Sequence, residues 1–220
     1  MIRKGIPMGL QIFVISFSGV LMVTLVNRFG VDTAAAYGAA LQLWNYVQMP
    51  AFAVGMAVSA MAAQNVGAGQ WQRVQQTARV GVGYSLLVTA TFIALIELFS
   101  RPALGLFLPT STAALAIAEH LNRISAWSFL FFGVSMVLFG VVRATGAVMP
   151  PLIILSVTLL VIRYPLAYCL VDRWQADAIW WSFPFSSAIA MVLAVTYYKY
   201  GGWRRARMID RPLTASTDAA

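Results

Sequence analysis

Six long apolar runs alternate with shorter polar segments along this chain of 220 residues. Each run holds at most one charged residue and spans the roughly 18–20 residues that a helix needs to cross the hydrocarbon layer of a bilayer. We predict transmembrane helices over residues 6–27, 34–64, 80–99, 124–142, 150–171 and 178–198. The predicted fold class is therefore an all-α membrane protein of six transmembrane helices.

The second span is longer than a straight crossing requires. No charged residue occurs in the 40 residues between Asp32 and Arg73. A helix over residues 34–64 would be about 46 Å long. A tilt, a bend at Pro50 or an extension beyond the membrane must absorb the excess length.

The connections on either side of the third span differ in kind. Two glycines and several polar residues at 67–73 predict a short turn between antiparallel helices. Residues 101–121 instead predict an amphipathic connector at the membrane interface, with a break at Pro109 and capping candidates at 110–112.

Composition excludes several functional classes. Hydrophobic residues make up 60% of the chain and charged residues only 10%, whereas a soluble domain has roughly 25% charged residues. The net charge of +8 comes from Lys and Arg placed between apolar runs, which does not predict nucleic acid as a partner. No HExxH motif, Ser/His/Asp set or pair of membrane carboxylates is present, so we expect no enzyme, no catalytic residue, no cofactor and no metal. The single cysteine, Cys169, lies in an apolar span and is expected to serve packing.

Positive charge predicts the orientation, because Lys and Arg are retained on the cytoplasmic side. Alternate connections place ten of these residues on one side and five on the other, and with the acids the net charges are +8 and 0. The richer side holds Arg3, Lys4, Arg73, Arg79, Arg143, Lys199, Arg204, Arg205, Arg207 and Arg211. We therefore expect a multi-pass protein of the cell inner (plasma) membrane with both termini in the cytoplasm.

The second span carries the densest polar content inside the membrane. Gln42, Asn45 and Gln48 fall within an arc of about 120°, together with Met49 and Phe52. Such a face either forms hydrogen bonds between helices or forms the wall of a cavity for an amphipathic solute. The sequence leaves these two alternatives open.

Three further polar residues call for an interpretation. Gln11 is the one amide deep in the first span, and close helix packing is its commoner role. Arg163 lies inside the fifth span, where it would either pair with Glu97 or extend to the outer interface. His120 on the connector is expected to be solvated. The candidate substrate-binding residues are Gln11, Gln42, Asn45, Gln48, Met49 and Phe52.

Several local motifs occur in an order and spacing that resemble the second lobe of the multidrug and toxic compound extrusion (MATE) transporters. They are Gly5–Gln11, Val26–Gly30, Ala35–Ala39, Gln64–Gly69, Arg143–Gly146 followed by Pro150, and Ile162–Tyr168. The resemblance covers residues 5 to about 207. It divides the chain into a six-helix lobe at 1–207 and a disordered cytoplasmic tail at 208–220.

The resemblance implies a partner lobe and a transport function. The family has twelve helices in two lobes around a central cavity, and it exports cationic or lipophilic compounds in exchange for Na⁺ or H⁺. This chain resembles the C-terminal lobe alone, so a missing N-terminal lobe is the expected partner, besides the lipid bilayer, a small organic solute and the coupling ion. Repeats of this kind place the solute site at their interface.

The chain differs from one branch of the family at two positions, and two other functions are alternatives to transport of organic solutes. The NorM branch of the family carries acids in the first and fourth helices of this lobe, where this chain has Ile15 and Phe132. One rival is a lipid-linked oligosaccharide flippase of the related superfamily, which needs a strongly basic cavity for a pyrophosphate, whereas Arg163 is the one plausible buried base. The other is a membrane subunit that assembles with partners and transports nothing.

Overall fold

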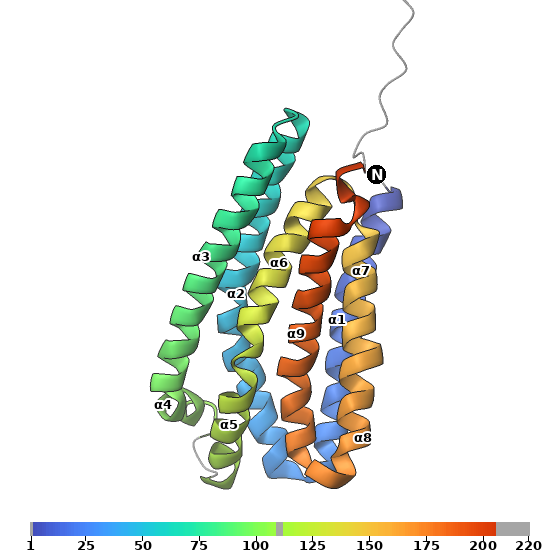
Figure 1. Ribbon diagram of the computed structural model, residues 1–220. Coiled ribbons are helices and arrows are strands. Elements are labelled where there is room, and N and C mark those ends of the chain that lie inside the picture. The colour runs from blue at the N-terminus through green and yellow to red at the C-terminus, as the bar shows by residue number, and fades with distance from the viewer. Residues whose placement is uncertain (1, 109–111, 206–220) are drawn as a thin grey trace, which may run out of the picture.

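A computed structural model gives the structure of residues 2–108 and 112–205, and almost all of them are helical (Figure 1). The long helices run side by side in one bundle. In chain order they are α1 (Ile2–Val26), α2 (Val31–Gly67), α3 (Trp71–Leu98), α4 (Ser100–Gly105), α5 (Thr112–Ser125), α6 (Ser128–Ala144), α7 (Met149–Ser156), α8 (Tyr164–Trp174) and α9 (Ala176–Tyr200). A π-helical segment, Val157–Arg163, joins α7 to α8, and short 3-10 turns occur at Asn27–Phe29 and Gly202–Arg205.

The predicted set of six spans is confirmed in its main features. Five stretches are long and apolar enough to cross a membrane: Gly5–Phe29, α2, α3, the continuous rod Met149–Trp174 and α9. The pair α5 and α6 passes the same test together, with a bend of 47° between the two helices, and gives a sixth when the pair is counted as one span. The third span begins at Trp71, nine residues before its predicted start.

The predicted connector at 101–121 is helical over most of its described part. It consists of two helices, α4 and α5, and α5 leads directly into α6 as part of the bent span. Pro109 and the capping positions 110 and 111 lie outside the described residues, as does the predicted tail at 208–220. The predicted packing role of Cys169 is wrong, because its side chain is exposed on the surface of α8.

Successive long helices run in opposite directions, so their connections alternate between two ends of the bundle (Figure 1). One end holds the N-terminus, the turn between α2 and α3 and the turn between α6 and α7. The other end holds α4 and the turn between α8 and α9. At the first end α2 and α3 project beyond the other helices, which accommodates the 37 residues of α2, about 56 Å of helix.

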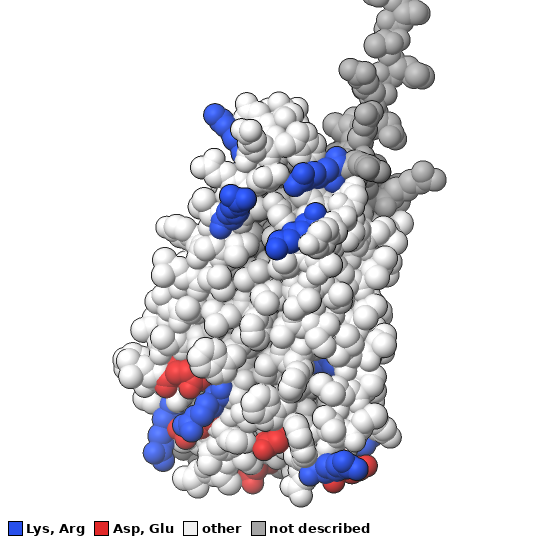
Figure 2. Space-filling view, viewed as in Figure 1, with Lys and Arg blue, Asp and Glu red and all other residues white. Residues whose placement is uncertain are grey.

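Charged residues gather at the two ends and leave a broad uncharged band between them (Figure 2). In this view the end with the N-terminus carries Lys and Arg, and the acids lie at the opposite end beside further basic residues. An uncharged band of this kind suits a bundle whose sides face hydrocarbon.

Helix α6 forms the centre of the bundle. Every residue from 133 to 142 is buried, and α6 packs against α2, α3 and α9. The backbones approach closely because glycines lie at the contact: a Cβ atom on Gly140 would lie 2.7 Å from the carbonyl oxygen of Gly55 on α2. Small residues permit such approaches between membrane helices.

Candidate functional site

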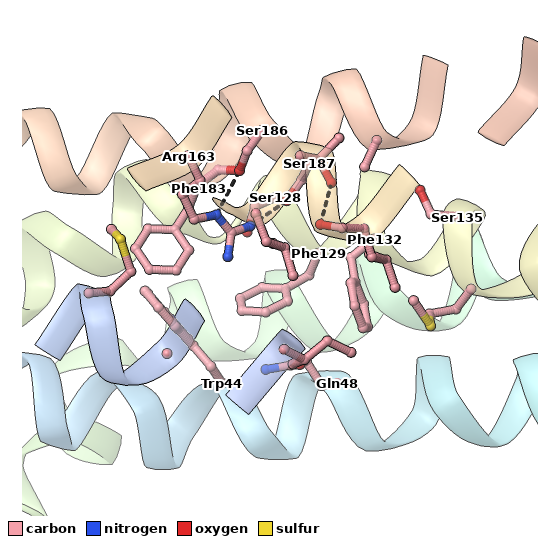
Figure 3. Close-up of a pocket in the computed structure, with 18 of the residues that line it drawn as sticks. Trp44, Gln48, Ser128, Phe129, Phe132, Ser135, Arg163, Phe183, Ser186 and Ser187 are labelled. Atoms are coloured by element: carbon pink, nitrogen blue, oxygen red, sulfur yellow. Dashed lines mark hydrogen bonds between the residues drawn. The ribbon is translucent and has the colours of Figure 1, made fainter. Parts of the chain in front are cut away.

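A cavity of about 180 Å³ lies inside the bundle, between α1, α2, α6, the π segment with the end of α7, and α9 (Figure 3). Most of its wall is apolar or aromatic, with a few polar groups, as is typical of small-molecule sites. The polar side chains are Tyr37, Gln48, Ser128, Ser135, Thr158, Arg163, Ser186 and Ser187.

Arg163 is the one basic residue among the described residues that line this cavity. Its Nε donates a hydrogen bond to Ser186 Oγ at 2.7 Å, and its Nη2 donates to Ser187 Oγ at 3.4 Å (Figure 3). The guanidinium carbon lies 4.6 Å from the centroid of the Phe183 ring, a cation–π contact. These three residues of α9 fix the position of the charged group.

The π segment explains how Arg163 and Thr158 share the cavity wall. In an α-helix, residues five apart point about 140° away from each other. In a π-helix the hydrogen bonds join residues five apart, so the two positions are stacked along one face. Thr158 and Arg163 both line the cavity, at the start and the end of this segment. Segments of this type occur frequently at functional sites.

Trp44 forms much of the aromatic wall and is held by a chain of hydrogen bonds. Its ring meets Phe183 at 5.2 Å and Phe129 at 5.6 Å between centroids, both edge to face. Its Nε1 donates to Asn122 Oδ1 at 3.1 Å, and Asn122 Nδ2 donates to Glu97 Oε1 at 3.0 Å. The chain connects α2, α5 and α3, so the indole cannot turn without breaking it.

The predicted polar face of α2 is divided between the cavity and the surface. Gln48 lines the cavity. Gln42, Asn45, Met49 and Phe52 are exposed beside it. These four residues are called the open face of α2 below, because each of them is exposed.

Gln11, the sixth predicted contact, lies elsewhere. It is buried on α1, and its Oε1 accepts a hydrogen bond from Arg143 Nη1 at 3.3 Å. It does not line the cavity, and its Nε2 has no partner among the described residues.

An aromatic pair separates the cavity from the open face. Phe52 meets Phe132 edge to face, with 5.3 Å between ring centroids, and Phe132 lines the cavity. Ile15 lines it as well. The two positions for which the resemblance to the NorM branch implies an acid therefore lie at this cavity, and no Asp or Glu occurs among the described residues that line it.

Both predicted alternatives for Arg163 are wrong. Its partners are Ser186 and Ser187 rather than Glu97, which accepts a hydrogen bond from Asn122 instead. The guanidinium points into the cavity and not to the outer interface (Figure 3). Exposed His120 lies 2.9 Å from the Asp177 carboxylate, a surface contact between α5 and α9.

Sequence reasoning missed the serines and aromatic residues of α9 that complete this site. Serines in membrane helices commonly form hydrogen bonds with the backbone of their own helix, so the sequence did not predict a binding role for Ser186 and Ser187. One usable signal was present: Ser182, Ser186 and Phe183 place hydroxyl and aromatic groups on successive turns of one otherwise apolar span.

Comparison with known proteins gives a consistent result. The sequence model of the MatE family matches residues 7–169. Over 91% of its length the chain is 34% identical to "Probable multidrug resistance protein YoeA" of Bacillus subtilis, and over 94% it is 33% identical to "Probable multidrug resistance protein YpnP" of the same organism. Among solved structures, the Vibrio cholerae MATE transporter VcmN in its bent form superposes with a TM-score of 0.82 at 17% identity.

The chain spans about half the length of the proteins it matches. It covers 43% of YoeA, 46% of YpnP and 48% of the VcmN chain, and 94% of its own length takes part in the VcmN match. The likeness therefore concerns a single lobe of the fold.

Proposed function

Because this chain belongs to the MatE family, we propose that it forms the C-terminal lobe of a secondary active antiporter that exports organic solutes, cationic or lipophilic, in exchange for Na⁺ or H⁺. The observation that carries the proposal is the similarity to two Bacillus subtilis proteins, each named as a probable multidrug resistance protein, over more than 90% of the chain. The family consists of transporters, so the expectation that the chain is not an enzyme is confirmed.

A second lobe completes the solute pathway in this proposal. The open face of α2 supports it, because two amides there, Gln42 and Asn45, would otherwise meet hydrocarbon. An amide without a hydrogen-bond partner in such surroundings costs about 2–7 kcal/mol. Beside them Met49 is 63% exposed and Phe52 is 40% exposed, so polar and apolar groups are presented together. An opposing lobe or an amphipathic solute would satisfy both kinds of group.

The solute-contacting residues we propose are the predicted six. Gln48 would contact the solute inside the cavity, and the four residues of the open face would contact it at the surface of the lobe. Gln11 is the one of the six that lies away from both surfaces, buried against Arg143, so its contact with the solute requires a rearrangement of α1. Their roles are polar and aromatic contact with the solute, and none carries a proton.

The coupling ion is bound outside this cavity in the proposal. Ile15 and Phe132 cannot bind a cation as a carboxylate would, and the described lining contains no acid. We therefore assign the carboxylate that binds Na⁺ or H⁺ to the second lobe.

The orientation belongs to the proposal as well. The chain is a multi-pass membrane protein. We place it in the cell inner membrane with the end that holds the N-terminus in the cytoplasm, because that end carries the excess of Lys and Arg.

A chimera tests the proposed function. The N-terminal half of YoeA is joined to this chain and expressed in an efflux-deficient bacterium, where resistance to lipophilic cations and efflux of a fluorescent cation are measured. The chimera should confer both. The variant Asn45→Leu should weaken resistance at normal membrane levels, whereas Gln72→Leu, on the exposed start of α3, should not. If resistance is unchanged in Asn45→Leu, or falls only in proportion to the amount of protein in the membrane, the open face serves helix packing and not solute binding.

A further inference from the structure

Arg163 holds a positive charge inside the bundle that no described carboxylate balances. Two ion pairs of the described residues, Arg101–Glu119 and His120–Asp177, lie on exposed or partly exposed side chains outside the cavity lining, and neither includes Arg163. The cavity lining contains no acid. A charge inside a membrane protein is costly unless a partner or water satisfies it. A negatively charged group from outside the chain would supply that partner.

The hydrogen bonds of Arg163 leave donors free for such a group. A guanidinium has five N–H donors, and described residues engage two of them, one on Nε and one on Nη2. Ser186 donates its own proton to the Phe183 carbonyl oxygen at 3.1 Å, so its oxygen is left to accept from Nε. The serine therefore orients the guanidinium without neutralising it. The remaining N–H groups belong to Nη1 and Nη2, and the guanidinium points into the cavity (Figure 3).

The chemistry of the wall selects one kind of anion. A guanidinium pairs with a carboxylate through two parallel hydrogen bonds, and one positive charge balances one negative charge. A doubly charged phosphate would keep an uncompensated charge in the same place. Three aromatic rings line the same cavity as the charged group, those of Trp44, Phe129 and Phe183. Such rings favour stacking or edge contacts with another ring. The volume of about 180 Å³ suits a small aromatic group.

We propose that Arg163, oriented by Ser186 and held over Phe183, binds the carboxylate group of an aromatic solute. The proposal rests on the proposed transport function and deepens it, since it names a chemical feature of the solutes. A solute with both a carboxylate and a cationic group would use this site for the former and the second lobe for the latter.

Direct binding to the purified 220-residue chain in lipid nanodiscs tests the site. The probe is benzoate, and the matched probes are neutral benzamide, cationic benzylamine and phenyl phosphate. Calorimetry gives the affinities. Benzoate should bind at least about tenfold more tightly than benzamide, because charge-assisted hydrogen bonds to a guanidinium exceed neutral ones. Benzylamine should not bind at the site.

Variants connect the binding to Arg163. Arg163→Gln should remove the preference for benzoate over benzamide, and Arg163→Lys should restore part of it, since lysine keeps the charge but not the fork of donors. Arg173→Gln, on the exposed end of α8, is the control and should leave binding unchanged. If Arg163→Gln does not fold, the affinities of the unchanged chain for the four probes still test whether the site prefers a carboxylate.

Three results would overturn the proposal: equal affinity for benzoate and benzamide, tighter binding of phenyl phosphate, or benzoate binding that persists in folded Arg163→Gln. Absence of benzoate binding would overturn it as well, but would leave the transport proposal standing, because the assay needs neither a second lobe nor an ion gradient. Failed transport by the chimera, in turn, would leave the binding result intact.

Discussion

Asn122 joins three helices through its side chain alone. Its amide accepts from Trp44 and donates to Glu97, and the residue is buried with 1% of its surface exposed. A buried polar group stabilises a fold when it is paired and costs free energy when its partner is removed. The position of Trp44 in the cavity wall therefore depends on this residue of α5.

Asn122→Ala should lower the free energy of unfolding by about 1–3 kcal/mol, because it leaves the indole N–H of Trp44 without its acceptor. The measurement is the thermal midpoint of the purified protein in detergent. Gln72→Ala removes an exposed amide from α3 and should not shift the midpoint. Equal midpoints for the two variants would show that the chain of hydrogen bonds does not stabilise the fold.

Single residues were predictable where their type is rare in a membrane span. Gln48 was predicted because an amide inside an apolar span costs free energy unless it has a hydrogen-bond partner, so its presence indicates a role. The structure places it at the cavity. Arg163 was noticed for the same reason, but its partners were wrong, since they are serines 23 and 24 positions away. Ser182 bonds to the Ile179 carbonyl of its own helix, and nothing in the sequence distinguishes it from Ser186.

The contact between α2 and α6 depends on two glycines that face each other. A Cβ atom on Gly140 would meet the Gly55 carbonyl oxygen at 2.7 Å, and one on Gly55 would meet the Met136 carbonyl oxygen at 3.3 Å. Neither obstacle is a side chain that could rotate away. The two helices carry the cavity wall through Trp44, Gln48 and Phe132, so their spacing also sets the shape of the site.

Gly140→Val should force α2 and α6 apart and lower the free energy of unfolding by about 1–3 kcal/mol, the usual cost of overpacking. Thermal unfolding in detergent measures it. The control is Gly83→Val on α3, where a Cβ atom would meet nothing within 4 Å. A midpoint for Gly140→Val equal to that of Gly83→Val would contradict the close approach of the two helices.

Helices were predictable from length and hydropathy, and their irregularities were not. Runs without charge marked α1, α2 and α9 to within a few residues. The π segment at Val157–Arg163 leaves no trace in hydropathy, because its residues are as apolar as those of the α-helix around them. The 47° bend between α5 and α6 was missed because the amphipathic sequence of α5 was taken for an interfacial connector.

The molecule as a whole is organised by the alternation of its connections. Counting Lys and Arg in alternate connections assumed six crossings, and the connections do alternate between two ends of the bundle (Figure 1). The path of the chain was therefore predictable, whereas which end faces the cytoplasm is a separate, testable statement. The cavity between α1 and α9 was not predictable, because it depends on contacts between helices far apart in sequence.

Cysteine labelling tests the orientation on a Cys169→Ala background, which removes the one native cysteine. Cysteines replace Gln70, between α2 and α3, and Asp172, near the end of α8; both are exposed. An impermeant maleimide should label position 172 in intact spheroplasts and position 70 only after lysis. The reverse pattern would invert the orientation, and labelling of both from one side would contradict alternating crossings.

Dependence on a second lobe is tested by reconstitution. The purified chain and its chimera with the N-terminal half of YoeA are placed in separate liposomes with an imposed Na⁺ or H⁺ gradient and a fluorescent lipophilic cation. Because the open face of α2 leaves the pathway unshielded from lipid, the chimera should move the cation in the direction opposite to the flow of the coupling ion, and the chain alone should not. Gradient-dependent movement of the cation by these 220 residues alone would contradict the assignment of this chain as one lobe of a two-lobe transporter.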